Sequence, residues 1–300
     1  MSDELPQGVQ RNQPLARLTT VRTGGSGEFF ARAGSPEQLA ALLRWAHVQR
    51  HRVSVVGSGS NLLIADEGVR GLVIKLDKQL ASIDKDDDTH LVCGGGARLP
   101  AIAAYAAREG LSGIEFGVNI PGTLGGAVRM NANAYGGELA RVLEWVEIAQ
   151  PDGTTDRRTP DLLDFAYRSS GLEDGEVVTR ALLTLEPHPP QEIRESLEEM
   201  RRRRHEAQPQ GIKTFGSTFK NPKDGSRTAG LLLSEAECNG LQIGGARFAP
   251  KHANFVENLG EATTADVVAV MAEGRRRVLE RFGIELEPEV QTLGPVAFPW

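Results

Sequence analysis

Apolar positions near the start of the chain follow a helical period. They are spaced three and four residues apart, as on one face of a helix, at Leu39, Leu42, Leu43 and Ala46. Residues 35–38 read Ser-Pro-Glu-Gln, a capping box with proline at the first helical position, so the pattern also predicts where this helix begins. Apolar and β-branched runs at residues 52–56 and 71–76 predict two strands. The chain is therefore expected to open with a β-α-β arrangement.

The middle of the chain alternates between strand and helix signals. Residues 99–108 are alanine-rich and predict a helix that stops at Gly110. Residues 142–149 alternate like a strand and run into a Pro-Asp-Gly turn, and residues 177–185 predict a further strand that is closed off by prolines. The acidic segment 84–89 predicts a solvated turn or linker ahead of this region.

Helical patterns return in the last third, with short strands between them. A charged helix is expected at residues 191–207, and a late helix at about residues 265–282, between the capping pair Thr263 and Asp266 and Gly283. The arginine run at 201–204 predicts a solvated helix face, with anion binding as the less favoured alternative. These signals predict domains at residues 1–84, 85–190 and 191–300, with the last residues packing back on the first domain.

Composition narrows the class of protein. The chain has 300 residues, 40% hydrophobic and 25% charged, as expected for a soluble globular protein of several domains. A net charge of −6 argues against a general nucleic-acid binder, because neutralising phosphates requires a basic surface. Cys93 and Cys238 are far apart and predict buried thiols, so neither a disulfide framework nor a metal site is expected. No run approaches the roughly 20 apolar residues of a membrane span, which predicts a cytoplasmic protein.

Two glycine-rich loops suggest a dinucleotide site. Residues 57–63 read GSGSNLL directly after a predicted strand, so successive backbone N–H groups can surround phosphate oxygens. Leu62 stands where a Rossmann fingerprint needs its third glycine, and no GxxxxGK[ST] loop occurs. Residues 120–127 read IPGTLGGA, which lets backbone approach a bulky ligand closely. Each loop alone is explained equally well as a tight turn, but together they favour one shared dinucleotide.

A third segment gathers groups that carry chemistry. Residues 216–222 read GSTFKNP and place a hydroxyl, an ammonium and an amide between glycine and proline. Such a combination predicts a loop that presents polar groups to a small molecule. Taken alone, an ordinary polar turn is an equally good explanation, and the rest of the chain has to decide between the two.

Six motifs occur in the order that is found in UDP-N-acetylenolpyruvoylglucosamine reductases. They span nearly the whole chain, and their spacing resembles the shorter, second type of this reductase, which lacks an inserted loop in the substrate domain. The motifs are TTVRTGG (19–25), GSGSNLL (57–63), PGTLGG (121–126), YRSS (167–170), GSTFKNP (216–222) and LEPEV (286–290). The resemblance implies an α+β fold: a two-subdomain FAD-binding module of the vanillyl-alcohol oxidase (PCMH) type, followed by a C-terminal α+β substrate-binding domain.

The resemblance also implies a reaction in peptidoglycan precursor synthesis. NADPH reduces non-covalently bound FAD, and a hydride passes to UDP-N-acetylglucosamine enolpyruvate to give UDP-N-acetylmuramate. The UDP-sugar and NADPH are then the expected partners of a protein that acts as a monomer. Hydride addition leaves negative charge on the carbon beside a carboxylate, so the protein has to stabilise an enolate.

Site residues follow from the motif match. The resemblance implies that Arg168 holds the enolate and carboxylate, that Ser217 protonates the enolate carbon, and that Glu289 assists, as a protonated acid or through water. The implied substrate-binding residues are Tyr167, Arg168, Lys220 and Asn221. The implied cofactor-binding residues are Gly57, Ser58, Gly59, Ser60, Asn61, Leu62, Pro121, Gly122, Thr123, Gly125 and Gly126.

Two features depart from the family pattern or leave a role open. Asn119 and Asn133 stand where smaller residues are usual in the family, and these bulkier side chains are expected to tighten or reshape the flavin loop beside them. His252 lies in a segment similar to one of the family and is expected to support the fold rather than to anchor a flavin covalently. An FAD oxidase or dehydrogenase of another sugar or hydroxy acid is the main alternative, and a nucleotide-sugar binding protein without turnover is the other.

Overall fold

The computed structural model describes residues 5–223, 225 and 227–300. The chain forms two compact units. The first comprises Met1–Arg11, Phe29–Ser58 and Gly71–Arg204, and the second comprises Asn12–Glu28, Gly59–Arg70 and His205–Trp300. Each unit draws on segments that are separated in the sequence. The division at residues 84 and 190 that the sequence suggests stays a prediction.

Helix α1 (Pro36–Val48) begins where the capping pattern predicts. The Ser35 hydroxyl accepts a hydrogen bond from the Gln38 N–H at 3.3 Å, and the Gln38 carboxamide accepts one from the Gly34 N–H at 2.8 Å. In a capping box the N–H of the N-cap residue donates this second bond. Here the donor is the N–H of Gly34, one residue before the N-cap Ser35. The apolar face of α1 is buried against β2 (Ser26–Ala33) and β5 (Val69–Leu76), and this burial is what stabilises an amphipathic helix.

These strands belong to a four-stranded sheet ordered β1-β2-β5-β3. Strands β1 (Gln10–Pro14), β2 and β5 each belong partly to one unit and partly to the other. Strand β3 (Val53–Val55) lies entirely within the first unit. β3 and β5 pair in parallel, with Val53 opposite Leu72, as expected for strands on either side of a crossover.

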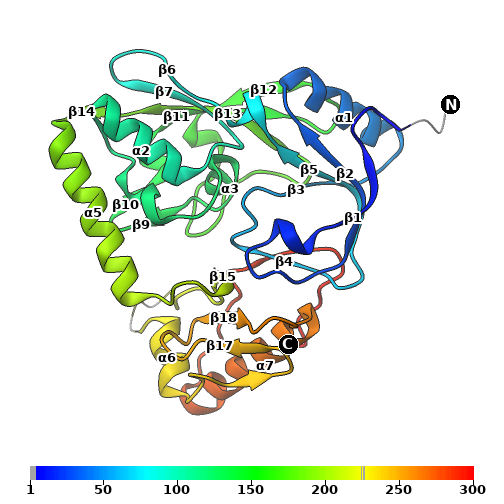
Figure 1. The fold of residues 1–300 in the computed structure, drawn as a ribbon, viewed down its shortest axis with the longest axis vertical. Coiled ribbons are helices and arrows are strands. Elements are labelled where there is room, and N and C mark those ends of the chain that lie inside the picture. The colour runs from blue at the N-terminus through cyan, green and yellow to red at the C-terminus, as the bar shows by residue number, and fades with distance from the viewer. Residues whose placement is uncertain (1–4, 224, 226) are drawn as a thin grey trace. The chain divides into compact units, whose positions relative to one another are not determined.

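A five-stranded antiparallel sheet forms the other layer of the first unit. Its order is β12-β11-β13-β7-β6, with bounds Thr155–Arg158, Leu143–Ala149, Val177–Thr184, His90–Gly94 and Ile83–Lys85. Helices α2 (Leu99–Glu109) and α3 (Leu124–Arg129) pack against this sheet in one hydrophobic core (Figure 1). Helix α2 ends at Gly110, as the sequence predicts, and Gly110 has a left-handed conformation.

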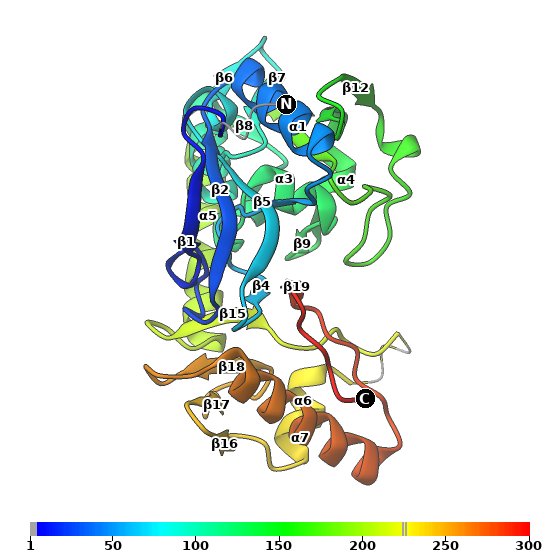
Figure 2. The ribbon, with the colours of Figure 1, turned by 90° about the vertical axis from the view of Figure 1, so that its right-hand side faces the viewer.

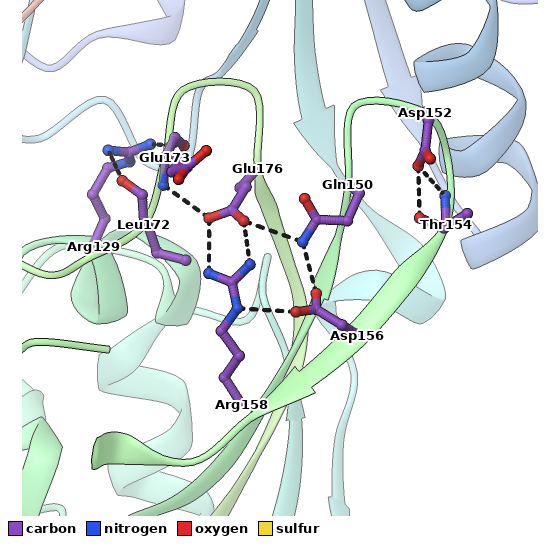
Figure 3. A network of polar contacts seen from close by, with 9 residues as sticks. All are labelled: Arg129, Gln150, Asp152, Thr154, Asp156, Arg158, Leu172, Glu173 and Glu176. Carbon is purple, nitrogen blue, oxygen red and sulfur yellow. Dashed lines mark hydrogen bonds and ion pairs between the residues drawn. The ribbon is translucent and has the colours of Figure 1, made fainter. Parts of the chain in front are cut away.

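A buried ion pair fixes a loop to hairpin β11-β12 (Figure 3). The Glu176 side chain is only 3% exposed, and its carboxylate accepts hydrogen bonds from the Arg158 guanidinium, the Gln150 amide (3.1 Å) and the Glu173 N–H (2.8 Å). Burial alone would raise the pKa of the Glu176 carboxyl, but these hydrogen bonds outweigh burial and lower it. The loop at residues 173–176 is therefore tied to the sheet.

Short elements and one long helix complete the first unit. The short elements are β8 (Leu111–Ser112) with β14 (Glu186–Pro187), β9 (Asn133–Ala134) with β10 (Gly137–Glu138), and α4 (Leu139–Val142). Most of helix α5 (Pro190–Ala207) also lies in this unit. On α5, Arg202 and Arg203 both pair with Glu199, in agreement with a solvated helix face, while Arg204 is half-buried and burial lowers its pKa.

The second unit is built on a four-stranded antiparallel sheet. Its order is β15-β18-β17-β16, with bounds Lys213–Ser217, Phe255–Asn258, Ala246–Phe248 and Gln242–Ile243. Helices α6 (Ala229–Glu235) and α7 (Thr264–Phe282) pack against this sheet (Figure 2). In the same unit β4 (Leu62–Ile64) pairs in parallel with β19 (Gln291–Leu293). Helix α7 carries the predicted capping box and ends at a left-handed Gly283.

Several expectations from the sequence can be compared with this fold. Residues 86–89 of the acidic segment 84–89 are confirmed as a turn, because they connect β6 and β7 in a hairpin, whereas Asp84 and Lys85 belong to β6. Cys93 and Cys238 are buried and unpaired, and burial raises the pKa of their thiols to about 12 and about 11. Within the described residues, every helix is too short or too polar to span a lipid bilayer. Short 3-10 helices occur at Ala16–Leu18, Lys78–Ala81, Glu115–Asn119 and Pro160–Leu162.

Candidate active site

Ser217 is the last residue of strand β15 in the second unit. The sequence predicts a loop over residues 216–222, but Gly216 and Ser217 still belong to the strand. Gly216 has a φ of +85°, and the register between β15 and β18 shifts beside it, which is typical of a bulge at the edge of a sheet. Phe215 and Phe219 are fully buried on either side. Ser217 therefore has a fixed backbone and a partly exposed side chain.

Asn254 clamps the backbone that follows Ser217. Its carbonyl accepts a hydrogen bond from the Thr218 N–H at 2.8 Å. Its carboxamide accepts from the Phe219 N–H and donates to the Phe219 carbonyl, both at 2.9 Å. Asn254 is buried, so these bonds form away from water, where leaving a backbone group unpaired costs free energy. The position of the serine is thus set by a residue remote from it in sequence.

Glu289 is aligned with the serine segment through the main chain. The Glu289 N–H donates to the Thr218 carbonyl at 2.9 Å, and Phe219 and Pro288 form an isolated antiparallel bridge. The Glu289 backbone therefore lies beside the peptide that follows Ser217. The structure brings these two predicted site residues together within one unit.

Asn61 holds the other side of the same segment. Its side-chain amide donates to the Glu289 carbonyl at 3.2 Å, and its own carbonyl accepts from the Gln291 N–H at 3.1 Å. The next residue, Leu62, begins β4, which pairs with β19, and β19 begins two residues after Glu289. The amide donor of Asn61 is therefore used within the protein, although the family resemblance implies a contact to the cofactor.

Lys220 and Asn221 lie just beyond the clamped segment. The Lys220 N–H donates to the Glu287 carbonyl at 2.9 Å, and its ammonium lies 3.6 Å from the Glu287 carboxylate. The Asn221 carboxamide oxygen accepts from the Ala229 N–H at 3.0 Å, at the first residue of α6. Asn221 therefore stabilises the start of a helix, a role that its sequence position does not reveal.

Arg168 lies in the first unit, at the tip of a two-residue hairpin. Ala166 and Ser169 exchange both backbone hydrogen bonds at 3.1 Å, which leaves Tyr167 and Arg168 as the central pair. Arg168 has a φ of +57°, a left-handed conformation that costs a residue with a side chain about 1–2 kcal/mol. Its guanidinium lies over the Tyr167 ring, 5.2 Å from the ring centroid. The backbone thus holds Arg168 in a strained conformation, as is common at functional sites.

The two glycine-rich loops meet in the first unit. A Cβ atom added at Gly57 would lie 2.4 Å from the Thr123 hydroxyl, so only glycine fits there without movement of Thr123. The Lys75 ammonium donates to the Gly57 carbonyl, and burial, followed by the charge of Arg32, lowers the pKa of Lys75. On the other side, the Gly125 N–H donates to the Gly95 carbonyl at 2.8 Å. Contacts within the protein therefore account for glycine at position 57.

We expect Gly57→Ala to destabilise the apo-protein by about 1–3 kcal/mol, because overpacking of this size has that cost. Thermal unfolding without FAD measures the effect, and Gly57→Ala combined with Thr123→Ala should recover most of it. Gly126→Ala is the matched control. Its added Cβ would lie 3.6 Å from the Thr123 hydroxyl, an ordinary contact. Equal losses in Gly57→Ala and Gly126→Ala would contradict the assignment.

Backbone donors in these loops fit an anionic group. Among the residues that the structure describes, the N–H groups of Ser58 and Gly126 in the first unit donate to no protein acceptor. The same holds, over those residues, for the N–H groups of Gly59 and Ser60 in the second unit. Phosphate oxygens accept such bonds readily, so these N–H groups within each unit suit an anionic group.

The structure shows which groups the side chains of Asn119, Asn133 and His252 contact. The Asn119 amide donates to the Tyr135 hydroxyl (3.2 Å) and the Met200 carbonyl (2.7 Å), and the Asn133 amide donates to the Asn131 carbonyl (3.4 Å). His252 is half-buried, its ring packs on Phe255 and accepts from the Asn254 N–H, and burial lowers its pKa. These contacts support the fold.

Sequence reasoning missed Lys75 and Asn254. A lysine inside the apolar strand sequence GLVIKL was a signal for the first, because a charge in a buried strand needs a partner. Asn254 gave no local signal, since its partners lie 35 residues away. Together, the described groups provide a hydroxyl beside a carboxylate-bearing segment, an arginine on a rigid turn, and loops with donors for an anion.

Comparisons with known proteins agree with this chemistry. Residues 28–157 match the family described as FAD binding domain, and residues 208–293 match the family described as UDP-N-acetylenolpyruvoylglucosamine reductase, C-terminal domain. The chain is similar to the UDP-N-acetylenolpyruvoylglucosamine reductase of Agathobacter rectalis, with 40% identity over 98% of this chain and 97% of that protein. The reductase of an Anaeromyxobacter species is 43% identical, over 95% of this chain and 89% of that protein.

A solved structure gives the same result. The crystal structure of UDP-N-acetylenolpyruvylglucosamine reductase from Thermus caldophilus superposes with a TM-score of 0.83 at 36% identity, covering 95% of this chain and 99% of that one. The expected fold is thereby confirmed: an FAD-binding module followed by a C-terminal α+β domain.

Proposed function

This chain belongs to the UDP-N-acetylenolpyruvoylglucosamine reductases, FAD-dependent oxidoreductases of UDP-N-acetylmuramate synthesis, and we propose that it uses NADPH with Arg168, Ser217 and Glu289 as catalytic residues. The observation that carries the proposal is the alignment of Ser217 and Glu289 through the hydrogen bond between Thr218 and Glu289. This bond supports the proposal, because a hydroxyl that donates a proton to an enolate and a carboxyl that assists it would then come from adjoining backbone segments.

The flavin is proposed to be held by the two glycine-rich loops. The first includes Gly57, Ser58, Gly59, Ser60, Asn61 and Leu62, and the second includes Pro121, Gly122, Thr123, Gly125 and Gly126. Support comes from the backbone N–H groups that donate to no protein acceptor in the described residues, and from the close approach of Gly57 to Thr123. When bound, FAD supplies the redox chemistry, carrying a hydride from NADPH to the enolpyruvyl methylene carbon.

Arg168 is proposed to bind the substrate carboxylate and the charge that develops beside it. Hydride addition to the methylene carbon turns it into a methyl group and leaves an electron pair on the neighbouring carbon, delocalised into the carboxylate. A guanidinium presents paired N–H donors to two oxygens at once, so it stabilises this dianionic group better than a single ammonium. A fixed hairpin suits that role because catalytic electrostatics require donors that do not have to reorganise.

Ser217 is proposed to donate its hydroxyl proton to that neighbouring carbon. The new C–H bond takes the electron pair of the enolate, and the serine oxygen recovers a proton from water. A hydroxyl is a weak acid, but the enolate carbon is a strong base, so transfer is favourable once charge develops. Glu289 is proposed to assist the enolate, as a protonated acid or through water. Tyr167, Lys220 and Asn221 are proposed to contact the UDP-sugar.

The two half-reactions test this proposal. The purified protein is expected to show a flavin absorption spectrum that NADPH bleaches and that UDP-N-acetylglucosamine enolpyruvate then restores. Both steps are followed by absorbance in a stopped-flow instrument without oxygen. A protein that is colourless and stays so after incubation with FAD contradicts any flavoenzyme. A reduced flavin that the substrate fails to reoxidise favours an oxidase or dehydrogenase of another sugar or hydroxy acid.

A further inference from the structure

The chain segment that follows the Arg168 hairpin is held by a second arginine. The Arg129 guanidinium donates to the Leu172 carbonyl at 3.4 Å and to the Glu173 carbonyl at 2.9 Å (Figure 3). The Arg129 carbonyl accepts from the Ser170 hydroxyl at 3.0 Å. One residue therefore fixes three successive points between residues 170 and 173.

Both ends of this segment are also fixed. The buried Asn131 side chain donates to the Ala166 carbonyl at 3.3 Å, at the base of the hairpin. At the far end the Glu173 N–H donates to the carboxylate of Glu176, the buried partner of Arg158 (Figure 3). A continuous set of hydrogen bonds thus runs from the sheet to the turn that carries the catalytic arginine.

Arg129 also connects this segment to a glycine-rich loop. It is the last residue of α3, whose first turn contains Gly125 and Gly126. Six helical residues span about 9 Å, at about 1.5 Å per residue, and a helix of that length is stiff. Bonds from Leu124 and Gly125 to the backbone of residues 95–97 fix its start. The helix therefore holds the loop and the hairpin at a set separation within the first unit.

We propose that Arg129 is a positioning residue, which holds the Arg168 hairpin at a fixed distance from the glycine-rich loop at residues 120–127. A residue such as Arg168, which has a side chain and a positive φ, keeps that backbone conformation only where the surrounding contacts hold it. The hydrogen bond between Ser170 and Arg129 provides such a contact. The acceptors of the Arg129 guanidinium are neutral backbone carbonyls. Its effect therefore depends on the fixed directions of its planar N–H donors and not on an ion pair. The inference rests on the proposed function, because it assigns Arg129 an effect on catalysis through Arg168.

Rates of the two half-reactions provide the first test. In Arg129→Ala we expect reduction by NADPH within twofold of the native rate and reoxidation by the substrate about tenfold slower, because a small misplacement of a catalytic group has a large cost. Arg129→Lys should recover only part of that loss. In a double-mutant cycle, Arg129→Ala should slow reoxidation no further when Arg168 is already replaced by glycine. Arg194→Ala, an exposed arginine of α5, is the matched control.

Hydrogen exchange provides a second readout that does not depend on catalysis. In the native protein the N–H groups of Ala166 and Ser169 are hydrogen-bonded across the hairpin, so Arg129→Ala should increase exchange at residues 166–169 at least fivefold. Unchanged exchange, equal loss in both half-reactions, or additive effects in the cycle would each overturn the inference. If Arg168→Gly itself leaves reoxidation unchanged, the proposed function fails, while exchange still decides whether Arg129 holds the hairpin.

Discussion

Replacement of Ser217 by alanine is expected to slow reoxidation of the reduced flavin by roughly 10²–10⁴, because general acid catalysis contributes about that much. Reduction by NADPH should be unchanged, since no proton from the serine is needed in that half-reaction. The backbone should also be unchanged, because Asn254 and Glu289 hold it through main-chain bonds to Thr218 and Phe219. Single-turnover measurements of each half-reaction separate the two steps.

The neighbouring hydroxyl provides the control for Ser217. Thr218 is fully buried, and its hydroxyl has no hydrogen-bond partner among the described residues. Thr218→Val keeps the side-chain shape and removes a buried polar atom, so it should retain both half-reactions and the native stability. Loss of both half-reactions in Ser217→Ala, or an equal loss of reoxidation in Thr218→Val, would contradict the assignment of Ser217 as the proton donor.

Replacement of Arg168 by glycine is expected to slow reoxidation by about 10²–10³, the usual effect of removing one donor to a developing oxyanion. Glycine accepts the left-handed φ of +57° without strain, so the hairpin should remain intact and the loss should report on the guanidinium. Arg168→Lys keeps the charge but loses the paired donors, and it should recover only part of the rate. Reoxidation kinetics over a range of substrate concentrations measure both variants.

Backbone and guanidinium effects at Arg168 can be separated further. Arg168→Ala removes the same side chain but keeps the strained backbone, so alanine and glycine variants should react at similar rates and differ in stability, with glycine the more stable. A large difference between their reoxidation rates would mean that the hairpin, and not the guanidinium, limits the reaction. Native rates in both variants would remove Arg168 from the catalytic residues.

Much of the secondary structure follows from the sequence because its signals are local. Ser35, Gln38, Thr263 and Asp266 interact with groups within four residues, so the starts of α1 and α7 were predictable. The two-unit division was not, since each unit joins segments that lie far apart in the chain. The candidate site residues were predicted from the order of the sequence motifs. That order does not indicate which of the residues lie close together in the folded protein.

The tertiary structure decided how those residues are placed. Asn61 and Glu289 are separated by 228 positions and share a hydrogen bond, and Gly57 meets Thr123 from a different loop. Such contacts depend on strand register and on packing between remote segments, which no local pattern encodes. The sequence by itself determined helices α1, α2, α5 and α7, several turns and the identity of the chemical groups. Only the tertiary structure decided that Asn254 clamps the serine segment, that Thr218 aligns it with Glu289, and that Arg129 holds the arginine hairpin.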